Sequence, residues 1–410
     1  MKLRARSSII LVFLLATIAL LWAGSEPPSF AEIGAIERGL SDITGLSFHR
    51  DVPYGVLSKE QLRRFLEERI KKTLKPDDLR AEELTLKMLG MVPPEFDLKQ
   101  NTVDLLTEQA AAFYDYNKKK LFILEGASSS VEDRTALVHE LAHALADQNF
   151  HLDKYIREGA RSDDESTARL AVMEGQATWL MAAYLAKQSG GPAEVSDSVL
   201  KLMSDSIQSS AREYPVFSKA PLYIRESLVF PYAQGMTFQN AVFHKLGRDG
   251  FADVFRNPPV STQQILHPDL YLEHHAPQIP DLPPLPDKHG FRKLADGTLG
   301  EFDYRALLEQ YAGEEGPSVA AHLNGSSYAL FEHKHDKYPV IVFASTWNSA
   351  DSAQKYVELY RKAMRGKWKT FEIEADSPAE LAGRGDSGHF RIRVEGTRVD
   401  QIEGWQSSVK

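Results

Sequence analysis

The sequence has no cysteine among its 410 residues. This absence excludes a disulfide framework, a thiol nucleophile, a cysteine ligand for zinc and a lipid-modified cysteine. The folded chain must therefore be stabilised by packing, and by bound metal if other side chains supply the ligands. A chain of this length can form two or three domains with a sizeable core.

An excess of positive charge is also missing. The chain carries 48 Lys and Arg residues against 57 Asp and Glu residues, a formal net charge of -9 at pH 7. This balance gives no reason to expect binding to phosphate backbones, so we predict no nucleic-acid partner. The hydrophobic share of 43% and the charged share of 26% are those of an ordinary globular protein rather than a disordered one.

The amino terminus has an apolar run at residues 9–23, preceded by the basic residues Lys2, Arg4 and Arg6. A basic head and a short apolar core are typical of a secretory signal, because a membrane span needs about 20 apolar residues. Residues 1–31 are therefore predicted to be a signal peptide. An uncleaved membrane anchor stays open as the alternative, and both predict export to the cell envelope, the periplasm or the exterior.

Helix and strand signals divide the remaining chain into four parts. The parts are 32–125 with helices and two short strands, 126–275 with helices, a stiff proline-rich linker at 276–290, and a small α+β domain at 291–410. The predicted helices are 58–72, 77–89, 135–150, 162–188, 196–213, 232–246 and 350–365. The predicted strands are 111–115, 121–124, 328–331, 339–344, 370–373 and 390–394. The overall class is α+β.

The segment 135–150 reads TALVHELAHALADQNF. Because a helix turns once in 3.6 residues, His139 and His143 lie one turn apart on one face. Zinc takes nitrogen or oxygen ligands of this kind, and Glu140 would lie beside a water molecule at the open position. Such a pattern arises by chance in roughly a few per cent of chains. We therefore favour a metal site over an ordinary helix with two histidines.

A third ligand has to come from elsewhere in the chain. Positions 146 and 149 are Ala and Asn, so the motif is not extended by a third histidine, and His151 lies just beyond the predicted helix end. Glu174 lies in an apolar helical stretch, where a buried carboxylate needs a cation. The alternative is a surface glutamate. Gly175 costs about 1 kcal/mol in a helix interior, and we expect it to allow close approach to the first helix.

The motif His139-Glu-Leu-Ala-His143 followed by Glu174 resembles the gluzincins, the thermolysin-like zinc metallopeptidases. The resemblance implies Zn²⁺ as the cofactor, His139, His143 and Glu174 as its ligands, and Glu140 as the general base. It also implies a zincin-like catalytic domain, with a small sheet, an active-site helix and following helices. The strands 111–115 and 121–124 resemble the zincin sheet, whose edge strand pairs with an extended peptide or protein substrate.

The chain departs from thermolysin in two ways. Thermolysin has an aspartate four residues after its glutamate ligand, where this chain has Thr178. We therefore expect Asp147 or Asp164 to orient the histidines instead. The segment 149–161 is predicted to be an additional loop.

The sequence thus predicts an exported zinc metallopeptidase, a hydrolase of peptide bonds. A donor should stabilise the oxyanion, with His267 as the first candidate and Tyr232 as the second. For both residues, a role in packing or capping is an equal alternative. Two rival functions remain: a zinc-binding protein of zincin fold that acts as a binding or regulatory module, and an envelope protein without metal.

Overall fold

The computed structural model describes residues 30–125, 131–159, 162–285 and 288–406. The chain has a mixed α+β fold, which confirms the predicted overall class. The predicted signal or anchor lies outside the described residues except for its last two positions. Among the described residues, none of the helices combines the length and the hydrophobicity of a membrane span.

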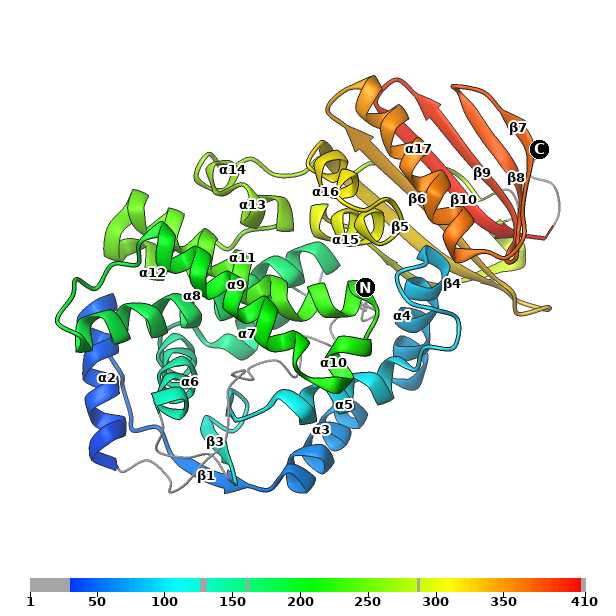
Figure 1. Cartoon of the computed structure of the whole chain (residues 1–410). Helices are drawn as coiled ribbons and strands as arrows, with labels where there is room; N and C mark the ends of the chain where they lie inside the picture. Colours follow the sequence, from blue (N-terminus) through cyan, green and yellow to red (C-terminus); the bar gives the residue numbers. More distant parts are fainter. Residues whose placement is uncertain (1–29, 126–130, 160–161, 286–287, 407–410) are drawn as a thin grey trace.

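The elements follow one another in three groups (Figure 1). The first group is α2 (Phe30–Thr44), β1 (Tyr54–Leu57), α3 (Lys59–Thr73), α4 (Pro76–Leu89), α5 (Leu98–Gln109), β2 (Ala112–Asp115) and β3 (Lys120–Leu124). The second is α6 (Val131–Phe150), α7 (Leu152–Gly159), α8 (Asp163–Gln188), α9 (Asp197–Arg212), α10 (Pro215–Lys219), α11 (Leu222–Leu246), η1 (Gly247–Asp249), α12 (Gly250–Arg256), α13 (Thr262–Leu266) and α14 (Pro268–Leu272). The third is η2 (Lys288–Gly290), β4 (Phe291–Gly297), α15 (Glu301–Ala312), α16 (Glu315–Ala320), β5 (Leu323–His333), β6 (Pro339–Trp347), α17 (Ala350–Lys367), β7 (Phe371–Asp376), β8 (Glu380–Gly385), β9 (Gly388–Glu395) and β10 (Arg398–Trp405).

Local sequence chemistry sets several helix ends. Ser58 and Gln61 form a capping box at the start of α3, in which each side chain accepts from the other residue's backbone N–H. Ser162 caps α8 by accepting from the N–H of Glu165. Gly90 ends α4 in the left-handed region with φ 79°. The predicted starts of α3 and α8 and the predicted end of α4 are confirmed to within one residue. Each of these boundaries is predictable because it depends on residues only a few positions apart.

Two predictions about the helices are wrong. The described part of the segment 149–161 is not a loop: α6 continues to Phe150, His151 has a positive φ of 56°, and α7 covers Leu152–Gly159. The helix predicted to start at Tyr232 begins at Leu222 and contains Pro231. A proline inside a helix removes one backbone hydrogen bond. Burial of most of α11 against its neighbours, above all α8, offsets this loss.

The small sheet lies against α6, far from the larger sheet (Figure 1). Its strand order is β1-β3-β2, with β1 parallel and β2 antiparallel to β3. Side chains alternate between the two faces of a strand. Phe113 and Phe122 stack with ring centroids 5.1 Å apart and face Phe65 of α3. Tyr114 points the other way, towards α6. Strand β2 is thus an edge strand beside the motif helix.

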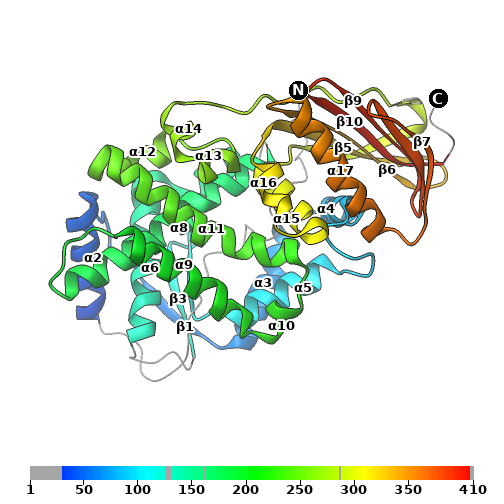
Figure 2. The same ribbon diagram turned by 45° about the horizontal axis from the view of Figure 1, so that its top comes forward.

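The carboxyl-terminal part is built on a seven-stranded antiparallel sheet of order β4-β5-β6-β10-β9-β8-β7, with α17 across one face (Figures 1 and 2). The proline-rich segment lies against the other face, where Leu282 and Leu285 pack beside Val340. The N–H of Gln278 donates to the carbonyl of Asn324. The predicted linker is therefore extended but packed on the sheet.

Buried carboxylates join the helical part to the carboxyl-terminal part. Asp163, at the start of α8, accepts from the hydroxyl of Tyr328 at 2.7 Å. Asp303, in the first turn of α15, accepts from the hydroxyl of Tyr223 at 2.8 Å. Burial, followed by the nearby charge of Asp164, raises the pKa of Asp303 to about 7. The carboxyl group of Asp303 therefore makes this junction sensitive to pH.

We expect the carboxyl group of Asp303 to stabilise the zinc-free chain less as the pH rises from about 4 to about 7. A group whose pKa is higher in the folded state than its usual 3.8 binds more protons when folded, so its contribution is largest at low pH and is lost through the folded pKa. Between pH 5 and 7.5, the free energy of unfolding should fall by about 2 kcal/mol more in the wild type than in Asp303→Asn. Denaturant titrations at both pH values measure this difference. An equal fall in the free energy of unfolding in the wild type and Asp303→Asn would show that Asp303 does not titrate in this window.

Candidate metal centre

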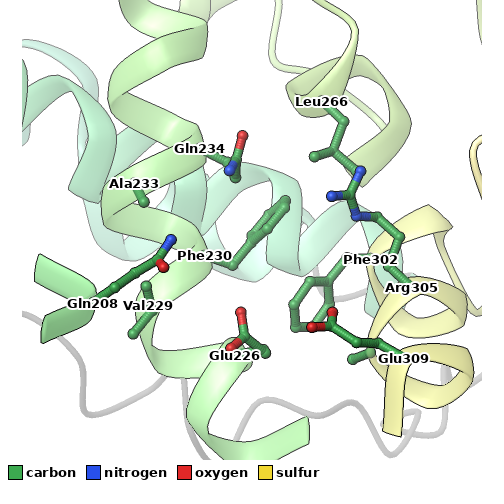
Figure 3. Close-up of a pocket in the computed structure, with 11 residues that line it drawn as sticks. Gln208, Glu226, Val229, Phe230, Ala233, Gln234, Leu266, Phe302, Arg305 and Glu309 are labelled. Atoms are coloured by element: carbon green, nitrogen blue, oxygen red, sulfur yellow. The ribbon is translucent and has the colours of Figure 1, made fainter. Parts of the chain in front are cut away.

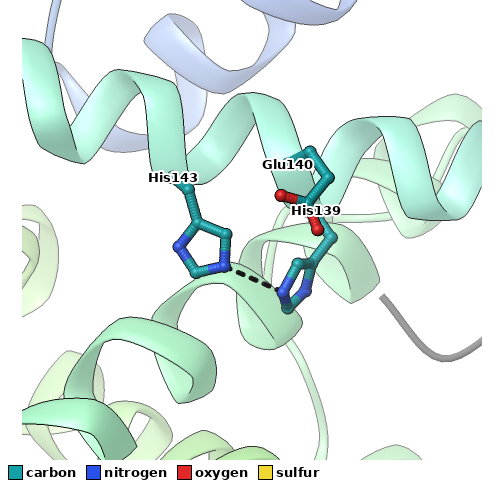
Figure 4. Close-up of side chains that lie close together, drawn as sticks. All are labelled: His139, Glu140 and His143. Carbon is teal, nitrogen blue, oxygen red and sulfur yellow. Dashed lines mark hydrogen bonds between the residues drawn. The ribbon is translucent and has the colours of Figure 1, made fainter. Parts of the chain in front are cut away.

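Three side chains from α6 and α8 meet at one buried point. The Nε2 atoms of His139 and His143 are 3.0 Å apart. The Oε2 atom of Glu174 is 3.1 Å from the first nitrogen and 3.3 Å from the second. Figure 4 shows both rings leaving the same side of α6 with these nitrogens facing each other. All three side chains are buried. The structure thus brings together the three residues predicted as ligands.

The spacing of these atoms fits a tetrahedral zinc site. Bond lengths of 2.0–2.2 Å to nitrogen and oxygen place neighbouring tetrahedral ligands about 3.3 Å apart. Within the described residues, Oε1 of Glu174 has no hydrogen-bond partner although it is buried. A buried carboxylate with an unsatisfied oxygen is costly unless a cation lies nearby. The donor set of two imidazoles and one carboxylate is therefore suited to Zn²⁺.

The electrostatics of the centre favour ligand protonation states that bind metal. Burial lowers the pKa of His139, so its ring stays neutral with a lone pair available. Burial alone would raise the pKa of Glu174, but His143 and then the contact with His139 outweigh that effect and lower it. The carboxylate of Glu174 is therefore ionised beside the neutral ring of His139.

Glu140 is close enough to be considered as an alternative third ligand. Its carboxylate and the two histidine rings offer ligand atoms within 4.8 Å of one another. However, Oε2 of Glu140 accepts a hydrogen bond of 2.7 Å from the N–H of Tyr114 in β2. Glu174 approaches both Nε2 atoms more closely. We therefore favour Glu174 as the ligand and place Glu140 beside the centre.

The helix that carries Glu174 crosses α11 at a contact between two glycines. A Cβ atom on Gly175 would lie 2.0 Å from the carbonyl carbon of Gly235, and one on Gly235 would lie 2.0 Å from the carbonyl oxygen of Ala171. The prediction that Gly175 allows close approach to the motif helix is wrong, because its close partner is α11. This crossing fixes the position of α8, and with it the position of Glu174.

The two candidates for oxyanion stabilisation lie in different surroundings. The ring of Tyr232, on α11, stacks on the ring of His139 with centroids 5.8 Å apart. Nε2 of His267 instead contacts the buried carboxylate of Glu301 at 2.9 Å, and this contact raises the pKa of His267. No hydrogen bond or ring contact joins His267 to the candidate ligands in the part of the chain that is described. Of the two candidates, Tyr232 is the one that contacts a candidate ligand among the described residues.

The residues expected to orient the histidines have other partners. Asp164 accepts from the N–H and the hydroxyl of Thr262. Asp147 accepts from the hydroxyl of Tyr114 at 2.8 Å. The hydroxyl of Thr178 donates to the carbonyl of Glu174 in its own helix. The expectation that Asp147 or Asp164 holds a histidine ring is therefore wrong.

A separate pocket lies between α9, α11 and α15 (Figure 3). Its walls include Phe230 and Phe302, with the carboxylates of Glu226 and Glu309 directed into it. Burial and then the charge of Glu309 raise the pKa of Glu226. This pair has no signal in the sequence, because its two members lie on helices far apart in the chain.

Comparison of the chain with models of protein families, with curated proteins and with solved structures gives no match. The features of the chain that point to a function are therefore the geometry of the candidate metal centre and the motif that supplies it.

Proposed function

We propose that the chain is an exported zinc metallopeptidase of the gluzincin type with a zincin-like catalytic domain. The observation that carries this proposal is the triangle of ligand atoms from His139, His143 and Glu174, with sides of 3.0, 3.1 and 3.3 Å. The basic and apolar amino-terminal sequence supports export. The adjacent Glu140 supports a hydrolytic site over a purely structural zinc site, which needs no base.

Zinc, when bound by these three residues, would supply a Lewis acid that polarises the carbonyl and makes hydroxide available near neutral pH. Glu140 takes a proton from the water whose oxygen attacks the carbonyl carbon. Its carboxyl group then gives that proton to the amine nitrogen as the C–N bond breaks. Tyr232, stacked on His139, is the favoured donor to the oxyanion, ahead of His267.

The edge strand β2 supports a peptide as the substrate. The N–H of Tyr114 points to Glu140 and not to β3, so the outer edge of β2 faces the centre. A sheet edge binds an extended peptide through backbone hydrogen bonds. A peptide lying along β2 would place its carbonyl groups next to the proposed base.

Zinc content tests the ligand set. The wild-type chain should bind one zinc ion, and Glu174→Gln should weaken zinc binding by more than about 100-fold, because losing a ligand exceeds the 10- to 100-fold effect of losing a ligand's partner. Elemental analysis and competition with a chelator measure both. Glu140→Gln is the matched control and should keep its zinc. If Glu140→Gln lost its zinc and Glu174→Gln kept it, Glu140 would be the ligand. The absence of zinc from the wild type would refute the proposal.

A further inference from the structure

The carboxylate of Glu140 is held by strand β2, in addition to being attached to α6. Its Oε2 atom accepts the N–H of Tyr114 at 2.7 Å. We infer that Tyr114 is a positioning residue, which fixes β2 on α6 through Asp147 and Lys119 and thereby fixes the carboxylate of Glu140. This inference rests on the proposed function, in which Glu140 is the base.

Tyr114 contacts α6 at two separate places. Its backbone N–H binds Glu140, and its hydroxyl donates to Oδ2 of Asp147 at 2.8 Å. The two acidic residues are seven positions apart on α6, which corresponds to about 10 Å along the helix axis. The residue therefore lies along the helix and is fixed at both ends, so that β2 can neither slide nor tilt without breaking one of the bonds.

Asp147 connects three elements. Its side chain is fully buried, and its Oδ1 atom accepts from Nζ of Lys119 at 2.7 Å and from the N–H of Leu152 at 3.1 Å. Lys119 lies in the turn between β2 and β3 and has a φ of 53°. Asp147 thus links α6 to three neighbours: the side chain of Tyr114 in β2, the turn that follows β2, and the start of α7. Hydrogen bonds to a charged group are stronger than neutral ones.

The short strand depends on these side-chain contacts for its position. Strand β2 has four residues and pairs on one side only, with β3. Burial and then the charge of Asp147 raise the pKa of Tyr114, so its hydroxyl remains a donor throughout the pH range in which a peptidase works. The bond to Asp147 therefore holds β2 in place whether or not a substrate lies along its outer edge.

The hydrogen bond from the N–H of Tyr114 makes the position of the proposed base, Glu140, depend on the position of β2. A displacement of about 1 Å in a catalytic group can lower the rate by about 100-fold. Because Tyr114 N–H holds Glu140, a shift of β2 would move or free the carboxylate while leaving His139, His143 and Glu174 in place. We call the hydrogen bond between Tyr114 and Asp147, which holds β2 on α6, the strap. Loss of the strap should therefore affect the rate of the chemical step and not the binding of zinc.

The variant Tyr114→Phe tests this inference, because it removes only the hydroxyl that reaches Asp147. We expect kcat for a peptide substrate to fall by about 10-fold, within the range of a small displacement. KM and zinc affinity should change by less than about twofold, and the pH profile of kcat should shift as the base loses its fixed partner. The amide at position 114 should exchange its hydrogen at least about 10-fold faster in the zinc-free chain.

Tyr116→Phe is the matched control. Tyr116 is a buried tyrosine of the same hairpin, and its ring lies beside the guanidinium of Arg69, on α3, at 5.0 Å. Its substitution should leave kcat, the pH profile and exchange at position 114 unchanged. If Tyr114→Phe folds poorly, Lys119→Gln removes the charged donor to Asp147 at a partly exposed side chain and should change the same readouts in the same direction.

The readouts separate failure of this inference from failure of the proposed function. A wild-type chain that binds zinc but cleaves no peptide would refute the peptidase, while hydrogen exchange at position 114 would still test the strap. Equal kcat and equal exchange in Tyr114→Phe and Tyr116→Phe would refute the inference. A parallel loss of zinc affinity in Tyr114→Phe would also refute it, because the strap would then support the ligands.

Discussion

Replacing Glu140 by Gln should lower peptide hydrolysis by about 10³-fold or more while the chain keeps its zinc and its fold. General bases contribute about 10²–10⁴-fold to such reactions. A carboxamide cannot take the proton of water, but its oxygen can still accept the N–H of Tyr114 at the same position. The side chain keeps its volume at a site with no solvent exposure. The substitution therefore removes the basicity of the residue and little else.

Hydrolysis of a broad peptide library, followed by chromatography, measures this loss. Glu82→Gln is the matched control, because it converts another buried glutamate, on α4, to the same amide. We expect that variant to retain wild-type activity per folded molecule. Equal activity in Glu140→Gln and the wild type would exclude Glu140 as the base. Equal inactivity of both, with zinc bound, would favour a binding or regulatory module instead.

The parts of this structure that were predictable depend on residues close together in the sequence. The cap at Ser58 and the stop at Gly90 are local, and so is the placement of two histidines on one helical face. The candidate metal centre needs one further inference, which is long-range. Glu174 was singled out because a carboxylate in an apolar helical stretch needs a cation, and it lies 3.1 Å from Nε2 of His139.

The parts that were missed depend on packing between distant segments. Nothing local indicates that Pro231 lies inside a helix, because the burial that offsets the lost hydrogen bond comes from other elements. The sequence predicts a stiff linker in the proline-rich segment, since Leu282 and Leu285 gain their partners only when the sheet forms. Asp147 was given the wrong partner for the same reason: the hairpin that supplies Tyr114 approaches from outside the motif helix.

Replacing Gly175 by Ala should destabilise the fold by about 3 kcal/mol or more and also weaken zinc binding. The added Cβ would lie 2.0 Å from the carbonyl carbon of Gly235, and this contact is with backbone, so no rotamer change can relieve it. Overpacking costs about 1–3 kcal/mol when side chains can adjust, and more when they cannot. Because Glu174 is the preceding residue, any separation of α8 from α11 also displaces the proposed ligand.

The helical glycine Gly34 provides the comparison. A Cβ atom there would meet only the side chain of Arg38, at 3.5 Å, which is an ordinary contact. Gly34→Ala should therefore be neutral or stabilising by up to about 1 kcal/mol, as helix propensity predicts. Gly235→Ala should match Gly175→Ala in stability, since its Cβ would lie 2.0 Å from the carbonyl oxygen of Ala171. Thermal unfolding with and without zinc measures all three. If Gly175→Ala were as stable as Gly34→Ala, the two helices would not cross at this contact, and the position of Glu174 would need another explanation.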